Sequence, residues 1–186
     1  GVENIGEDSA SFVGEAEKVT KIEFATASDT IAKSSKARIQ FRAVNQYGEQ
    51  ANVSAGDFTV NTPGFDGSFI TKDDAGNFYV NINTDREGLV IGSSLIPVFI
   101  YENTSRITVS QNFRLGAEPF VMKMELGTVT YSNGKDTISA SGEYATIPVT
   151  LFDQYGNPLP YDSKPAEEWS ANIFTSPYNE NIVTQF

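Results

Sequence analysis

LFDQYGNPLP, residues 151–160, and FRAVNQYGEQ, residues 41–50, share one pattern. Each begins with an apolar run, continues into Asp or Asn, and then reads Gln-Tyr-Gly. Apolar and polar residues that alternate are typical of a β-strand with one buried face. Asn, Asp and Gly tolerate the positive φ of tight turns. The sequence therefore contains the same strand-and-turn corner twice. We expect Tyr47 and Tyr155 to pack over the two corners.

The second corner can be followed residue by residue. Ile147, Val149 and Leu151 alternate with their neighbours, so they are expected to face a core. Gly156 supplies the positive φ of the turn, and Pro158 prevents the strand ladder from continuing. This stretch predicts a structural corner without chemistry of its own.

The match between the two copies extends beyond the corners. Three pairs of segments correspond: KIEF (21–24) with KMEL (123–126), DTIAKS (29–34) with DTISAS (136–141), and ARIQFRAVNQYG (37–48) with ATIPVTLFDQYG (145–156). The offset grows from 102 to 107 and then 108 residues, so the second copy carries small loop insertions. A repeat of this period has the length of an immunoglobulin-like domain and is too long for a solenoid unit.

The repeat divides the chain into three parts. Residues 1–17 are predicted to be a linker or the end of a preceding module. Residues 18–117 are expected to form a first immunoglobulin-like β-sandwich domain, and residues 118–186 a second. Their boundary lies in RLGAEPF, 114–120, where a glycine and a proline end a strand. Only about 67 residues remain for the second copy where about a hundred are needed, so we expect it to be incomplete.

Short alternating segments cover the first copy, and they predict an all-β fold of antiparallel sandwiches. These segments are VTKIEFA (19–25), KARIQFRAV (36–44), FYVNIN (78–83), SLIPVFIY (94–101) and RITVSQNF (106–113). Turn residues separate them at intervals typical of a sandwich. No window shows convincing helical periodicity.

Composition excludes several functions. The net charge is −11, from 24 acidic and 13 basic residues, which disfavours a nucleic-acid partner or an anionic membrane surface. The chain has no Cys and no His, which excludes disulfides, thiolate zinc sites and imidazole bases. The longest apolar run, Leu95–Tyr101, is too short to cross a bilayer. We therefore expect no membrane insertion.

VTLFDQYGNPL, 149–159, resembles the strand-and-turn signature of bacterial immunoglobulin-like domains in surface-layer proteins of Gram-positive bacilli. The first copy resembles the same modules, and the looser form D-x-x-G-N-P also occurs in stalk domains of intimin- and invasin-type adhesins. The resemblance implies an extracellular, structural role in a lattice on the cell surface, often with calcium. The chain departs from the pattern at Glu49, where the signature has Asn, and contains no surface-layer-homology anchoring module.

Acidic residues suggest two kinds of site. Paired carboxylates among Asp73, Asp74, Asp85 and Glu87 could serve a glycosidase. The simpler interpretation is that Asp73 and Asp74 are solvated in a hairpin turn, and we predict no catalytic residues.

Calcium is the better hypothesis for the acids, because hard cations prefer several oxygen ligands. Four donors could gather near the junction of the two domains, namely Glu118, Asp153, Asp66 and Asp85. No stretch follows a known calcium-loop pattern, so the identity of any metal site stays open.

Aromatic residues offer a sugar-binding alternative. Trp169 with Tyr155, Tyr161 and Tyr178 could form a platform for stacking on carbohydrate. The alternation in WSANIF, 169–174, favours Trp169 as a core residue of the second sandwich instead.

The sequence therefore predicts a non-enzymatic structural module of a bacterial surface-layer protein. Its partners would be other copies of the protein or neighbouring immunoglobulin-like domains, with cell-wall polysaccharide bound through regions outside this chain. The alternatives are an adhesin stalk, a carbohydrate-binding module of a secreted protein, and an accessory domain of a secreted hydrolase. Because the net charge is negative, calcium is the cofactor that the sequence suggests.

Overall fold

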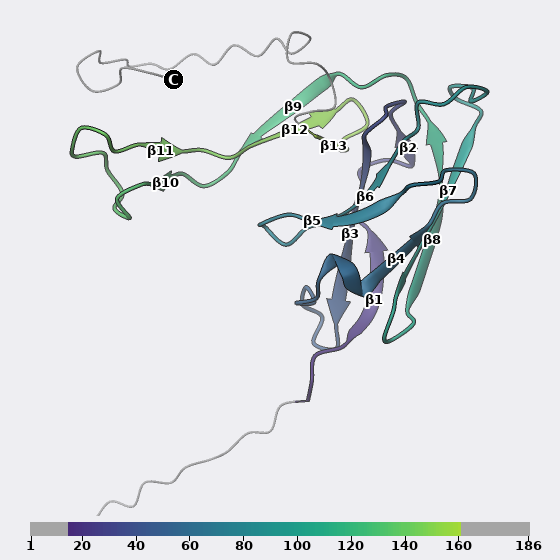
Figure 1. The fold of residues 1–186 in the computed structure, drawn as a ribbon, viewed down its shortest axis with the longest axis horizontal. Helices are drawn as coiled ribbons and strands as arrows, with labels where there is room; N and C mark the ends of the chain where they lie inside the picture. Colours follow the sequence, from purple (N-terminus) through teal and green to yellow (C-terminus); the bar gives the residue numbers. More distant parts are fainter. Residues whose placement is uncertain (1–14, 161–186) are drawn as a thin grey trace, which may run out of the picture.

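The computed structural model describes residues 15–160, and Figure 1 shows the arrangement of their strands. The described chain consists of strands, turns and a single 3-10 turn at Ala55–Asp57, so the all-β prediction is confirmed. Across residues 15–160, no helix has the length and apolar character that a bilayer crossing requires.

Strands β1 to β8 form a first sandwich. Their bounds are β1 Val19–Phe24, β2 Thr30–Ile31, β3 Ala37–Asn45, β4 Phe58–Asn61, β5 Phe69–Lys72, β6 Phe78–Ile82, β7 Leu95–Glu102 and β8 Thr108–Leu115. One sheet has the order β1-β3-β6-β5, and the other has the order β2-β8-β7-β4. All neighbours are antiparallel except β2 and β8, which are parallel.

Aromatic rings bind the two sheets of the first sandwich together. Phe41 of β3 meets Phe58 of β4 edge to face at a centroid distance of 5.4 Å, and Phe24 of β1 meets Phe113 of β8 at 5.2 Å. Rings at such distances add to the free energy that apolar burial supplies. The alternating residues of β3, from Ala37 to Ala43, are buried on this side, as their period predicts.

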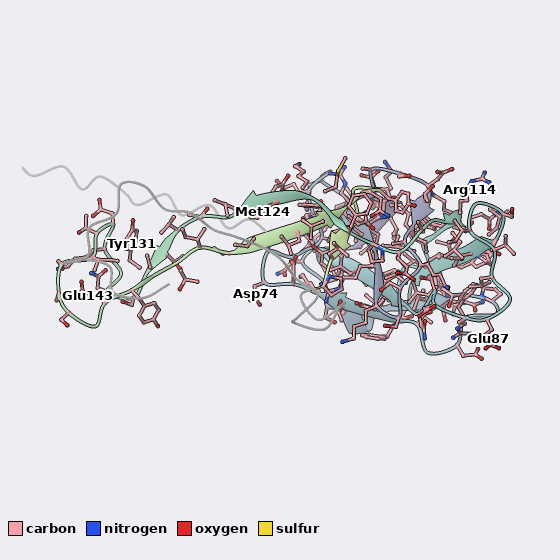
Figure 2. All side chains as sticks on the ribbon, turned by 90° about the horizontal axis from the view of Figure 1, so that it is seen from above. Asp74, Glu87, Arg114, Met124, Tyr131 and Glu143 are labelled. Carbon is pink, nitrogen blue, oxygen red and sulfur yellow. The ribbon has the colours of Figure 1, made fainter. Side chains whose placement is uncertain are left out.

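Strands β9 to β13 form a second unit that extends away from the first sandwich (Figures 1 and 2). Their bounds are β9 Val121–Leu126, β10 Thr130–Tyr131, β11 Ala145–Thr146, β12 Val149–Asp153 and β13 Pro158–Leu159. They pair as a three-stranded sheet, β13-β12-β9, and a two-stranded ribbon, β10-β11.

The second unit exposes apolar side chains that the sequence assigns to a core. Ile147 is 46% exposed and Val149 is 45% exposed, whereas Leu151 is half-buried. Met122 and Met124 of β9 are also exposed. The expectation that Ile147 and Val149 face a core is wrong for the described chain, because no second sheet within residues 15–160 packs on β9 and β12.

The strand register confirms that the two copies are built alike at their first strand pair. In the β9–β12 ladder the pairs are Val121 with Asp153, Lys123 with Phe152, Met124 with Leu151, Glu125 with Thr150, and Leu126 with Val149. In the β1–β3 ladder the pairs are Val19 with Asn45, Lys21 with Val44, Ile22 with Ala43, Glu23 with Arg42, and Phe24 with Phe41. The repeat is therefore also a repeat of strand pairing, including the register shift next to Asn45 and Asp153.

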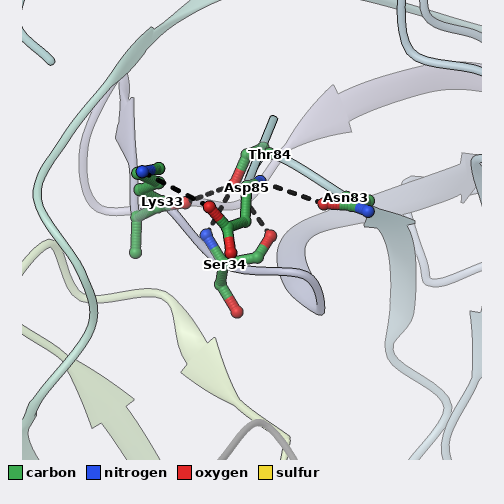
Figure 3. Close-up of polar contacts among 6 residues, drawn as sticks. Lys33, Ser34, Asn83, Thr84 and Asp85 are labelled. Carbon is green, nitrogen blue, oxygen red and sulfur yellow. Dashed lines mark hydrogen bonds and ion pairs between the residues drawn. The ribbon is translucent and has the colours of Figure 1, made fainter. Parts of the chain in front are cut away.

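A buried threonine ties β2 to the end of β6. Thr84 is fully buried, and its Oγ1 accepts the N–H of Ser34 at 2.8 Å and donates to the carbonyl of Ala32 at 2.7 Å. Beside it, Lys33 pairs with Asp85 at 3.3 Å (Figure 3). These contacts fix the segment after β2, on which the second unit rests.

Replacing Thr84 with Val keeps the shape of the side chain and removes its hydroxyl. The N–H of Ser34 and the carbonyl of Ala32 then lose this partner in a buried position, which costs about 1–3 kcal/mol. Urea denaturation of the full chain should show this loss for Thr84→Val. The exposed Thr108→Val variant is the control, and an equal effect in both variants would contradict the role given to Thr84.

Candidate functional site: the joint between the two repeats

The linker between the two units, residues 116–120, runs along the first sandwich. The N–H of Gly116 donates to the carbonyl of Ile31 at 2.7 Å, and the N–H of Lys33 donates to the carbonyl of Ala117 at 3.1 Å. These bonds continue the parallel pairing of β2 with β8. Because the backbone groups of the linker are engaged, the linker is part of the sheet edge rather than a free tether.

The corner that follows β12 is a tight hairpin turn. The N–H of Asp153 donates to the carbonyl of Asn157 at 2.9 Å, and the N–H of Gly156 donates to the carbonyl of Asp153 at 3.0 Å. The carboxylate oxygen Oδ1 of Asp153 accepts the N–H groups of Tyr155 and Asn157. Gly156 has a φ of +78°, as the sequence predicts for this position.

Two side chains of this corner bind the backbone of the linker. The phenol oxygen of Tyr155 accepts the N–H of Ala117 at 2.7 Å. The amide of Gln154 donates to the carbonyl of Glu118 at 2.9 Å and accepts the N–H of Phe120 at 3.1 Å. The corner therefore binds both carbonyl and N–H groups of the linker, and these contacts favour one position of the linker on the corner.

Glycine at position 116 makes this contact possible. A Cβ atom added to Gly116 would lie 2.4 Å from the Tyr155 ring, closer than non-bonded atoms allow. The ring therefore rests directly on the linker backbone. The sequence predicts Gly116 only as a strand breaker and carries no signal of this contact.

The corner also contacts the first sandwich itself. The side-chain amide of Asn157 donates to the carbonyl of Thr30 in β2 at 3.0 Å. A Cβ atom at Gly156 would lie 2.8 Å from the Cβ of Ala27. These contacts of the corner 153–157 with the linker and with β2 form the joint between the two units. Asp153 is 4% exposed and Asn157 is 2% exposed, so both polar side chains are buried there.

The space beside the joint is small. A gap of about 10 Å³ lies among side chains that include Ala32, Pro119 and Pro158. This volume is about that of one water molecule and far below that of a ligand pocket. The joint is therefore a contact between protein surfaces rather than a binding pocket.

Burial changes the acidity of Asp153. Loss of solvent raises the pKa of this carboxyl above its ordinary value, although hydrogen bonds from the turn oppose the change. Asp73 begins a turn of the same geometry in the β5–β6 hairpin, with its N–H on the carbonyl of Asn77. There burial also raises the pKa, but hydrogen bonds from Asn77 and Tyr79 outweigh it and leave the pKa of Asp73 lowered.

The tyrosines of the two corners differ in their surroundings. Tyr155 packs on the linker at Gly116 rather than on its own corner. Tyr47, at the same place in the first corner, is 64% exposed. The expectation that each tyrosine packs over its own corner is therefore wrong. The contact with Ala117 gives the Tyr155 hydroxyl a partner, whereas nothing in the described chain covers Tyr47.

The acids suggested for calcium serve different local contacts. Asp153 binds the N–H groups of its own turn, and Glu118 offers its backbone carbonyl to Gln154. Asp85 pairs with Lys33, and Asp66 lies in a turn whose carbonyl accepts Arg86. Within residues 15–160, no three or more acidic side chains gather as metal ligands.

The carboxylates considered for a glycosidase lie in loops. Asp73 accepts hydrogen bonds from Asn77 and from the Tyr79 hydroxyl inside its hairpin. Asp74 lies at the tip of that hairpin, and Glu87 lies far from it (Figure 2). The structure therefore does not bring Asp74 and Glu87 together.

The proposed aromatic platform falls mostly outside the described chain. Trp169, Tyr161 and Tyr178 lie outside the described residues. Tyr155, the remaining member, is engaged in the joint.

Comparisons of this chain with protein-family models, with curated proteins and with solved structures found no match.

Replacing Gly116 with Ala should open the joint. The new methyl group would force Tyr155 off the linker, at a cost of about 1–3 kcal/mol, and the N–H of Ala117 would lose its partner. Amide hydrogen exchange at Ala117 should then accelerate, while the strands of the first sandwich keep their protection.

Gly56→Ala is the matched control for this substitution. A Cβ atom at Gly56 has only an ordinary contact, 3.7 Å from the Ser54 hydroxyl. Unchanged exchange at Ala117 in Gly116→Ala would contradict the contact with Tyr155.

The raised pKa of Asp153 predicts a pH dependence. A carboxyl whose pKa is higher in the folded state adds stability below its unfolded pKa, and this stability is lost as pH rises through the folded pKa. Asp153→Asn keeps the Oδ1 acceptor and removes the charge. The variant should be more stable than the parent chain at about pH 7, and the difference should shrink on acidification.

Asp73→Asn is the control with the opposite sign. The pKa of Asp73 is lowered, so its charge stabilises the folded chain above the unfolded pKa, and this is lost as pH falls. Thermal unfolding across this pH range measures both variants. If the stability of both variants relative to the parent chain changes with pH in the same direction, the opposite effects assigned to Asp153 and Asp73 are wrong.

Proposed function

We propose that this chain is a non-enzymatic structural part of a bacterial cell-surface protein, and that it belongs to a self-assembling surface-layer lattice. The observation that carries the proposal is the joint, in which Gln154 and Tyr155 bind the backbone of the linker. A joint of this kind fixes the spacing and direction of two successive units. Lattices and stalks require such fixed geometry, whereas a flexible tether would not provide it.

The fold supports tandem immunoglobulin-like domains as the building units. The sheet β1-β3-β6-β5 has the strand order of A, B, E and D in an immunoglobulin sandwich. The opposite sheet places β8, β7 and β4 as G, F and C, with β2 added beside β8. The register shared by β1–β3 and β9–β12 supports the same plan for the second unit, β9 to β13. Fold alone does not assign function, so the surface role rests on the joint and on the resemblance.

Partners in this proposal are further copies of the same protein, outside the cell. Contacts between copies can each be modest, because many act together in an array. The charge of −11 makes copies repel one another at low ionic strength. Calcium ions would reduce this repulsion and could bridge acids on different copies.

Light scattering and negative-stain electron microscopy of the full-length protein test the proposal. Ordered sheets or tubes should grow when calcium is added, and a chelator should dissolve them. Ordered growth that ignores both calcium and chelator would remove the cation from the proposal and keep the lattice. A protein that stays monomeric at all concentrations would contradict the lattice and favour the adhesin-stalk alternative.

A further inference from the structure

The first corner, Asn45–Glu49, has the same backbone geometry as the corner that forms the joint. The N–H of Asn45 donates to the carbonyl of Glu49 at 2.8 Å, and the N–H of Gly48 donates to the carbonyl of Asn45 at 3.1 Å. The side-chain oxygen of Asn45 accepts the N–H groups of Tyr47 and Glu49, both at 3.0 Å. Gly48 has a φ of +82°. The first corner is therefore preformed for the contacts that the second corner makes.

The glutamine of the first corner already binds the incoming chain. The amide of Gln46 donates to the carbonyl of Ala16 at 3.1 Å and accepts the N–H of Lys18 at 2.9 Å. Gln154 binds Glu118 and Phe120 in the same way, and each partner lies 102 residues after its counterpart. This is also the offset between β1 and β9. The chain therefore enters both units along the same path.

The sequences that lead into the two units also correspond. VGEAEKV, 13–19, aligns with LGAEPFV, 115–121, without a gap. The alignment sets Gly14 at the position of Gly116, the glycine on which Tyr155 rests. Glu15 then takes the position of Ala117, whose N–H binds the Tyr155 hydroxyl.

One difference between these two leading segments is compensated locally. Glu17 stands at the position of Pro119, and its carboxylate accepts the side-chain N–H of Asn45 at 2.8 Å. The second corner has Asp153 in place of Asn45, and an aspartate could not donate to a glutamate. Asn45 can therefore bind Glu17 in the first corner, whereas the second corner combines Asp153 with Pro119, which needs no such hydrogen bond.

We infer that the first corner is a docking site for the carboxy-terminal end of another β-sandwich module of this same type, joined through Gly14. In that joint the hydroxyl of Tyr47 accepts the N–H of Glu15, as the hydroxyl of Tyr155 accepts the N–H of Ala117. The 64% exposure of Tyr47 marks the surface that the module covers. Glu49 stands in place of Asn157 and cannot donate to a carbonyl, so this joint lacks the equivalent of the bond to Thr30.

This inference rests on the equivalence of the two corners and does not depend on the cell-surface role. A joint at Tyr47 suits a lattice, a stalk or any other row of modules. A negative result in the lattice experiment would not contradict the joint at Tyr47. A negative result for the joint at Tyr47 would not decide the surface role, which the lattice experiment tests.

The test adds a module in front of the chain. A second copy of residues 18–116 is placed before Glu15, in place of residues 1–14, so that its terminal glycine takes the position of Gly14. Amide exchange at Glu15 is compared with that in the original chain, and Ala117 in the same molecule is the internal reference. Exchange at Glu15 should become about tenfold slower, since the hydrogen bond to the Tyr47 hydroxyl then protects its N–H.

Two tyrosine variants separate the joints in the extended chain. Tyr47→Phe should restore fast exchange at Glu15 and leave Ala117 protected, and Tyr155→Phe should do the reverse. Fast exchange at Glu15 in the extended chain, with Ala117 protected, would overturn the inference. Slow exchange that persists in Tyr47→Phe would also overturn it, because another group would then provide the protection.

A second measurement does not depend on folding of the added module. The double substitution Asp153→Asn with Asn157→Glu gives the second corner the residues of the first, and it is made in the original chain. If the first corner can form this joint, exchange at Ala117 should stay within about threefold of the parent. Full loss of protection at Ala117 would show that the sequence Asn-Gln-Tyr-Gly-Glu cannot make the joint, and the inference would be wrong.

Discussion

The contact on which the arrangement of the two units depends is that of the Tyr155 ring with the linker at Gly116. Because Gly116 has no side chain, the ring reaches the backbone and its hydroxyl accepts the N–H of Ala117. Gln154 then binds the next carbonyl and N–H groups of the linker. Several otherwise free backbone groups become satisfied at once, which favours a single arrangement of the two units.

The corner has a double use that follows from its chemistry. Its backbone ends one strand and begins the next, and this requires only an Asn or Asp and a glycine with positive φ. The two residues between them are free to carry long polar side chains, and here these are Gln and Tyr. The turn therefore presents an amide and a phenol at a fixed angle from the end of the sheet, where the preceding unit lies.

Much of the fold could be predicted from the sequence, and the joint could not. Alternation and turn residues give the strands at 19–24 and 37–45, and the all-β class, because burial on one face leaves a period of two. Contacts between Gln or Tyr side chains and a backbone leave no period. The burial of Asp153 leaves no sequence signal either, since the residues of a turn are ordinarily solvated. Ile147 and Val149 show the opposite error, because alternation cannot say whether a second sheet covers them.

The joint makes the two units one body. Backbone ¹⁵N relaxation of the chain tests it most directly, because rotational correlation times of β3 and β12 can be compared in one sample. The joint predicts a single correlation time for both strands, appropriate to the whole chain. A distinctly shorter correlation time for β12 than for β3 would contradict it, and would mean that the linker lets the second unit move independently.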